Sequence, residues 1–139
     1  MDRPEPRVRQ LRLVVHADDY DSAVAFYRDA LGLTEELSIR GGDDAQVCIL
    51  SAGRATLEII NTAQRRAIDR VEVGRQVAGK YRVAFEVDDS AAVTDELVAA
   101  GADLLAPPTA TPWNSLNARL QAPADLQITI FAEQADGDG

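Results

Sequence analysis

The chain of 139 residues repeats one pattern twice, and this duplication restricts its fold more than any other feature. In both copies an apolar stretch with a central arginine runs into two adjacent aspartates, a helical pattern and a glycine. These residues are Arg12, Asp18-Asp19 and Gly32 in the first copy, and Arg82, Asp88-Asp89 and Gly101 in the second. An internal repeat of this length predicts two copies of one supersecondary unit.

Apolar patterning gives each copy the same order of elements. In the first copy a helix follows a strand at 9–16, and three strands follow at 33–40, 45–50 and 55–60. The helix has one apolar stripe at i, i+3, i+4, i+7 and i+8, formed by Ala23, Phe26, Tyr27, Ala30 and Leu31. In the second copy a helix that ends at Gly101 lies between strands at 81–87 and 102–106, followed by strands at 115–121 and 126–131. The proline-rich residues 107–112 are expected to break regular structure.

These elements predict an α+β fold made of two tandem βαβββ modules. We expect an N-terminal arm at 1–8, the first module at 9–61, a connector at 62–80, the second module at 81–132, and a flexible tail at 133–139. A short helix is expected near 63–71 of the connector. A four-stranded sheet with one helix leaves one face bare, so the modules should pair as an incompletely closed barrel around a cleft.

Composition excludes several classes of protein. The formal charge of −9 argues against nucleic-acid binding, which needs a basic surface, and permits a cationic ligand. No apolar run reaches the length of about 18 residues that predicts a membrane span, and the polar N-terminus lacks the apolar centre of a signal peptide. The single Cys48, expected to be a small core residue, fits a cytoplasmic protein.

The element order and the local motifs resemble the vicinal-oxygen-chelate superfamily. The motifs are Asp19, Phe26-Tyr27, Leu31-Gly32 and the Phe-Glu-Val-Asp-Asp sequence at 85–89. This superfamily contains glyoxalase I, extradiol dioxygenases, metal-dependent epimerases and thiol transferases, and bleomycin-resistance proteins. The resemblance covers roughly residues 9–131. It implies a cleft with a divalent metal, held by one residue on the first and fourth strand of each module, commonly His or Gln on the first and Glu on the fourth.

The four positions that correspond to those ligands here are Arg12, Glu58, Arg82 and Thr129. A guanidinium stays protonated and offers no lone pair, so neither arginine can bind a metal. Glu58 and Thr129 alone fall short of the three or four ligands that such an ion needs. His16, the only histidine, lies near the end of the first strand. We therefore expect neither a metal nor another cofactor.

Two uses of the arginines remain open. The resemblance implies that Arg12, Glu58, Arg82 and Thr129 face the cleft, where Glu58 can pair with either arginine. The remaining guanidinium can pair with Glu86, or it can bind a carboxylate or phosphate of a ligand through a bidentate contact. Trp113, after the proline-rich residues, can either stack on a planar ligand or pack structurally.

The expected function is binding of a small organic molecule in the cleft without a metal, as in the antibiotic-binding branch of the superfamily. The expected ligand-binding residues are Arg12, Glu58, Arg82, Trp113 and Thr129. The two arginines favour an anionic ligand, although that branch suits cationic drugs. A metal-dependent glyoxalase-, lyase- or dioxygenase-type enzyme is one alternative, and a non-catalytic dimer with a collapsed cleft is another. The resemblance also implies a homodimer.

Overall fold

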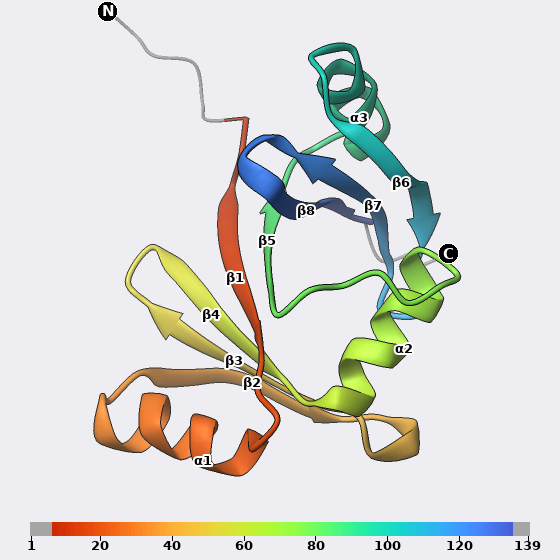
Figure 1. Ribbon diagram of the computed structural model, residues 1–139. Coiled ribbons are helices and arrows are strands. Elements are labelled where there is room, and N and C mark those ends of the chain that lie inside the picture. The colour runs from red at the N-terminus through yellow and green to blue at the C-terminus, as the bar shows by residue number, and fades with distance from the viewer. Residues whose placement is uncertain (1–6, 135–139) are drawn as a thin grey trace, which may run out of the picture.

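The computed structural model describes residues 7–134, in which eight strands form one continuous sheet (Figure 1). The first module comprises β1 (Gln10–His16), α1 (Tyr20–Val24) with a π-helical turn (Ala25–Ala30), β2 (Thr34–Arg40), a 3-10 turn (Gly42–Asp44), β3 (Gln46–Ala52) and β4 (Ala55–Ile60). The second comprises β5 (Tyr81–Glu86), α3 (Ser90–Ala99), β6 (Asp103–Ala110), β7 (Ser115–Ala122), a 3-10 turn (Pro123–Asp125) and β8 (Leu126–Glu133). Helix α2 (Thr62–Glu72) lies between the modules in sequence. Most of the predicted arm and tail lies outside the described residues, but Glu133 belongs to β8.

The strand order confirms the two paired βαβββ modules. It runs β2-β3-β4-β1-β5-β8-β7-β6, so each module has the same internal order and the sheet remains unclosed between β2 and β6. Strands β1 and β5 join the modules in an antiparallel pair that matches Leu13 with Val83. Helix α1 covers the outer face of the first module and α3 covers that of the second (Figure 1). Within residues 7–134, no helix has the length and apolar character that crossing a membrane requires.

The repeated aspartates begin helices, as their position before each helical pattern predicts. Asp19 accepts a hydrogen bond from the backbone N–H of Ser22 at 3.1 Å, and Asp89 accepts one from Ala92 at 3.0 Å. These carboxylates satisfy N–H groups that have no partner inside the helix. They therefore serve as helix caps.

The expected break at the proline-rich residues is wrong in its position. Pro107 and Pro108 lie inside β6, which continues to Ala110. Strand β6 is the last strand of the sheet and pairs only with β7, and its register shifts between Ala106 and Thr109. An edge strand with a bulge tolerates proline, because the missing N–H is not needed by a second neighbour.

Alternation along the strands separates the apolar core from the inner face of the sheet. In the first module Cys48, Leu50 and Ile59 pack against Val24 of α1 on the outer face. Cys48 is 1% exposed and is a small core residue, as predicted. In the second module the outer face packs under α3 through Val93, Ala118, Leu120 and Ile130. The intervening residues of each strand face inward, toward the cleft.

Helix α2 is anchored to the inner face of the second module by a buried ionic network. The Arg119 side chain on β7 is fully buried, and its Nη1 lies 2.8 Å from Asp69 Oδ1. Its Nε and Nη2 donate to Glu72 Oε1 at 3.1 and 2.8 Å, while Asn117 Nδ2 donates to Glu72 Oε2 at 2.7 Å. Each charge therefore has direct partners, which a buried ion requires.

The same network fixes the segment that follows α2. The second oxygen of Asp69 accepts hydrogen bonds from the backbone N–H groups of Val77 and Ala78, both at 2.8 Å. Gln127 accepts from Arg119 Nη1 at 2.7 Å and donates to the Val77 carbonyl at 3.1 Å. The connector is therefore a structural part of the second module.

Replacing Arg119 tests this anchor. Arg119→Ala leaves two buried carboxylates without their cation, so we expect a loss of about 3–5 kcal/mol in the free energy of unfolding. Urea denaturation measures it. Arg28→Ala is the matched control, because Arg28 pairs with Asp29 and Glu35 on the surface, where ion pairs contribute little. Equal losses in the two variants would contradict the anchoring role.

Candidate ligand-binding pocket

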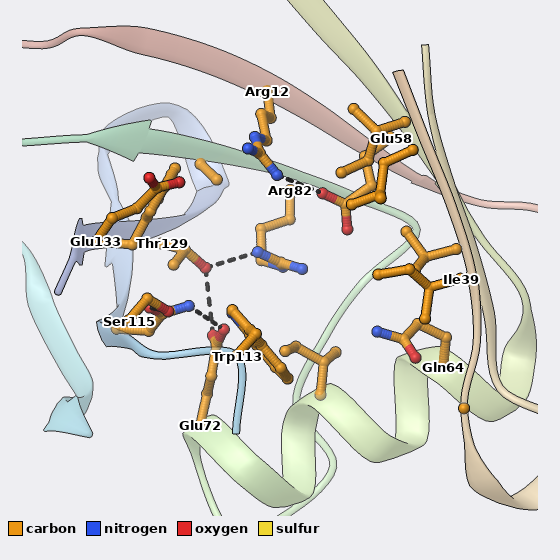
Figure 2. Close-up of a pocket in the computed structure, with 18 residues that line it drawn as sticks. Arg12, Ile39, Glu58, Gln64, Glu72, Arg82, Trp113, Ser115, Thr129 and Glu133 are labelled. Carbon is orange, nitrogen blue, oxygen red and sulfur yellow. Dashed lines mark hydrogen bonds and ion pairs between the residues drawn. The ribbon is translucent and has the colours of Figure 1, made fainter. Parts of the chain in front are cut away.

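A pocket of about 430 Å³ lies between the modules on the inner side of the sheet (Figure 2). Strands of both modules, α2 and the loop before β7 contribute its walls. The five residues predicted for ligand binding all line it: Arg12, Glu58, Arg82, Trp113 and Thr129. The structure thus brings them together, and their role toward a ligand remains a proposal.

The strand register supports the predicted equivalence of Glu58 and Thr129. Glu58 on β4 pairs with Val14 of β1, and Thr129 on β8 pairs with Ala84 of β5. Val14 and Ala84 each lie two residues after the arginine of their strand. The duplication therefore places Glu58 and Thr129 at matching positions beside their arginines.

The two modules give the pocket different walls. The first module and α2 supply an apolar wall of Leu37, Ile39, Val47, Ile49 and Ile68. The second module supplies a polar one. The strand register explains the difference. Ile49 pairs with Glu58, and Arg119 pairs with Thr129, so Ile49 and Arg119 occupy equivalent positions. In the same way, Val47 occupies the position equivalent to Asn117. Asn117 and Arg119 bind Glu72 of α2, whereas the apolar Val47 and Ile49 line the pocket.

Arg12 is the arginine that pairs with Glu58. Its Nη1 lies 3.8 Å from Glu58 Oε1, a distance of an ion pair without a hydrogen bond. Arg12 Nε donates to Gln10 Oε1 at 3.3 Å, and its guanidinium lies 5.5 Å from the centre of the Phe131 ring. Cation–π attraction thus adds to the contacts that hold this side chain.

Arg82 is more buried than Arg12 and is less directly paired. It is 6% exposed, and its Nη1 donates to Thr129 Oγ1 at 2.7 Å. Among residues 7–134, no carboxylate lies within the 4.0 Å of an ion pair with it. Glu86 is not its partner, because Glu86 accepts from Gln10 Nε2 at 2.9 Å. Figure 2 shows the Arg82 guanidinium with Glu58 on one side and Glu72 on the other.

Thr129 links Arg82 to the anchoring network. Its hydroxyl accepts from Arg82 and lies 3.4 Å from Glu72 Oε1, to which it donates. Burial lowers the pKa of the Arg82 guanidinium, and the nearby carboxylate of Glu72 opposes this change. An arginine nevertheless remains protonated in proteins. The pocket therefore contains the Arg82 cation, whose charge is balanced by carboxylates that it does not contact directly.

Of the carboxylates Glu58, Asp69 and Glu72, Glu58 has the weakest contacts. Its side chain is 16% exposed, and burial raises its pKa, whereas the charges of Arg82 and Arg12 act in the opposite direction. A buried carboxyl group in these surroundings takes up a proton more easily than one in water.

Trp113 stands at the edge of the pocket and is 51% exposed. The next residue, Asn114, has a φ of 66°, in the left-handed region that asparagine adopts more readily than most residues. The Trp-Asn sequence is thus compatible with a tight turn. Because packing covers only half of Trp113, its ring can also contact a ligand.

His16 lies outside this pocket. It is 8% exposed, and its Nε2 lies 2.8 Å from the Thr62 hydroxyl at the start of α2. Burial is the main cause that lowers the pKa of its imidazole. This histidine therefore connects β1 to α2 and is not part of the site.

The sequence analysis missed four polar residues around the pocket: Asp69, Glu72, Asn117 and Arg119. A signal was present, since Arg119 lies in a strand between the apolar Ala118 and Leu120, much as Arg12 and Arg82 lie between apolar neighbours. Asp69 and Glu72 are spaced i, i+3, which places both on one face of the connector helix. Each pattern marks charged groups that need a partner, but only the folded structure shows that the strand and the helix meet.

The residues at the four superfamily ligand positions do not fit a divalent metal. Two of them are guanidinium groups, which repel a cation, and Thr129 is already bound to Arg82. In the described part of the chain, no group of three or more His, Cys, Asp or Glu side chains could hold a metal ion.

Comparison with solved structures supports the fold. Methylmalonyl-CoA epimerase from Streptomyces coelicolor superimposes with a TM-score of 0.67 at 18% identity, covering 94% of this chain and 100% of that one. The Mycobacterium tuberculosis epimerase gives 0.66 at 17%, covering 96% and 94%. A hypothetical protein from Bacillus halodurans gives 0.67 at 12%, covering 92% and 96%. No curated protein matches the sequence.

A family model extends the similarity to the sequence itself. The model described as Glyoxalase/Bleomycin resistance protein/Dioxygenase superfamily matches residues 9–130, which include the first module and the second as far as Ile130 in β8. On the strength of this match and the duplicated βαβββ fold, the chain belongs to the glyoxalase/bleomycin resistance protein/dioxygenase superfamily.

Proposed function

We propose that this protein binds a small organic molecule in the pocket between its modules without a metal ion. The observation that carries the proposal is the combination of Arg82 and the apolar wall. Arg82 is a buried cation with no carboxylate in ion-pair contact among the described residues, and it lines a pocket of about 430 Å³. An apolar cavity with a few oriented polar groups is the usual form of a small-molecule site.

The alternatives receive less support. A collapsed cleft would contain paired arginines and no cavity, in contrast to the open pocket beside Arg82. A metal-dependent enzyme would need ligands where Arg12 and Arg82 lie. Sequestration of an antibiotic is a specific form of the proposal, and the exposed Trp113 ring suits a planar drug. The two arginines favour drugs that carry an acidic group.

Two further expectations remain part of the proposal. The homodimer follows from the family resemblance, and sedimentation at several protein concentrations would test it. The cytoplasm remains the predicted compartment because the single cysteine, Cys48, is a buried core residue and not part of a disulfide.

Removing Arg82 tests ligand binding. A thermal-shift screen of small organic acids, neutral compounds and cationic antibiotics first identifies ligands, since one present at about 100 times its Kd adds about 2.7 kcal/mol of stability. In Arg82→Ala we expect the affinity for these ligands to fall about tenfold or more, because one charge-assisted hydrogen bond contributes about 1.5–3 kcal/mol. The variant itself should remain folded.

Arg9→Ala is the matched control, because Arg9 pairs with Asp88 on the surface, away from the pocket. Its ligand affinity should equal that of the natural protein. If Arg82→Ala instead unfolds with a loss of about 3–5 kcal/mol, Arg82 is a structural partner of the network and not a ligand contact.

Metal analysis tests the second half of the proposal. We expect the purified protein to contain far less than one Ni, Zn, Fe or Mn per chain, because Arg12 and Arg82 occupy two of the four ligand positions. Treatment with a chelator should leave the melting temperature and ligand affinity unchanged. A stoichiometric metal that is lost together with activity would favour the enzyme alternative.

A further inference from the structure

Arg82, Glu58 and the charged side chains that act on them form a balanced set of six groups, here called the inner ionic cluster. It contains three arginines and three carboxylates: Arg12, Arg82, Arg119, Glu58, Asp69 and Glu72. Glu86, which accepts from Gln10, and the exposed Glu133 lie outside this set. Their formal charges sum to zero when all six are ionised. A ligand that brings a negative charge into this cluster therefore creates an excess, which is costly away from water.

The three carboxylates differ in how readily they can accept a proton. Glu72 accepts hydrogen bonds from Arg119, Asn117 and Thr129. Asp69 accepts from Arg119 and from two backbone N–H groups. Among the described residues, the direct contact of Glu58 is the ion pair of 3.8 Å with Arg12. Since hydrogen bonds stabilise the ionised form, protonation is least costly at Glu58.

We propose that the pocket binds an organic carboxylate together with one proton. The ligand carboxylate takes the free N–H donors of Arg82 and approaches Arg12, while a proton from solvent binds to the Glu58 carboxylate. An O–H bond forms on Glu58, no other covalent bond changes, and the cluster with its ligand returns to zero net charge. This inference rests on the proposed function and specifies its ligand class.

The surroundings of Glu58 set the direction of the effect. The charged groups that face it are Arg12 from β1, Arg82 from β5 and Glu72 from α2, while β3 presents the apolar Val47 and Ile49. Burial already raises the pKa of Glu58. A ligand carboxylate on the two guanidinium groups weakens their effect on Glu58 and raises this pKa further.

Linkage then predicts the pH dependence of binding. The pKa of Glu58 is higher in the complex than in the free protein. Binding therefore takes up a proton at pH values between these two pKa values. Affinity for the carboxylate should rise by about tenfold for each unit that the pH falls in this range. The affinity should level off at pH values below the pKa that Glu58 has in the free protein, where Glu58 is already protonated.

The rest of the pocket suggests the body of the ligand. Leu37, Ile39, Val47 and Ile49 provide an apolar wall opposite the polar one, and the Trp113 ring lies at the edge. Arylacetic acids and medium-chain fatty acids have this arrangement of one carboxylate and an apolar body. Phenylacetate and octanoate are therefore suitable probes, with phenylacetamide and octanamide as their neutral counterparts.

Calorimetry in two buffers with different ionisation enthalpies measures both affinity and proton uptake. For the natural protein we expect each acid to bind at least tenfold more tightly than its amide, with uptake approaching one proton within the linkage range. Glu58→Gln should bind the acid without proton uptake and without the pH dependence. Glu96→Gln, which changes an exposed carboxylate of α3 outside the pocket, should retain both.

The outcomes separate this inference from the proposed function. Equal binding of acids and amides overturns the inference and leaves metal-free ligand binding intact. Binding of the acid with no proton uptake at any pH also overturns it, and so does uptake that persists in Glu58→Gln. No binding of any of the four probes counts against both. If Glu58→Gln fails to fold, the proton count of the natural protein across pH still decides.

Discussion

The buried ionic contact of Arg119 with Asp69 and Glu72 is the interaction on which the rest of the structure depends. A guanidinium on the inner face of β7 must be paired, and its carboxylates come from the connector helix. Helix α2 is therefore drawn onto the inner face of the second module (Figure 1). The duplicated sheet offers two equivalent inner faces, and this ionic contact forms on the face of the second module.

The asymmetry of the inner faces explains the character of the pocket. Val47 and Ile49 occupy in the first module the positions that Asn117 and Arg119 occupy in the second. Val47 and Ile49 have no polar groups to bind the carboxylates of α2, and they line the pocket. Arg12 and Arg82, which the duplication made equivalent, accordingly differ: Arg12 has Glu58 as its counter-ion, while Arg82 reaches Glu72 only through Thr129.

Much of this arrangement could be predicted from the sequence, because the duplication and strand alternation are local patterns. The resemblance to the vicinal-oxygen-chelate superfamily implied that Arg12, Glu58, Arg82 and Thr129 face one cleft, and all four line the pocket. The contact of Arg119 with α2 was not predicted, since it joins residues about 50 positions apart that no local pattern relates. The prediction that Pro107 and Pro108 break regular structure was wrong for a related reason. Whether a strand tolerates proline depends on its place at the edge of the sheet, which is a tertiary property.

Native-state hydrogen exchange of α2 tests most directly the claim that the ionic contact locks the connector onto the second module. The backbone amides of residues 66–72 should exchange only when the whole protein unfolds, with the same free energy of opening as the central amides of β7. Exchange of α2 at a far smaller free energy, while β7 stays protected, would show that the helix opens on its own. In that case the buried pairing would not determine which inner face is covered.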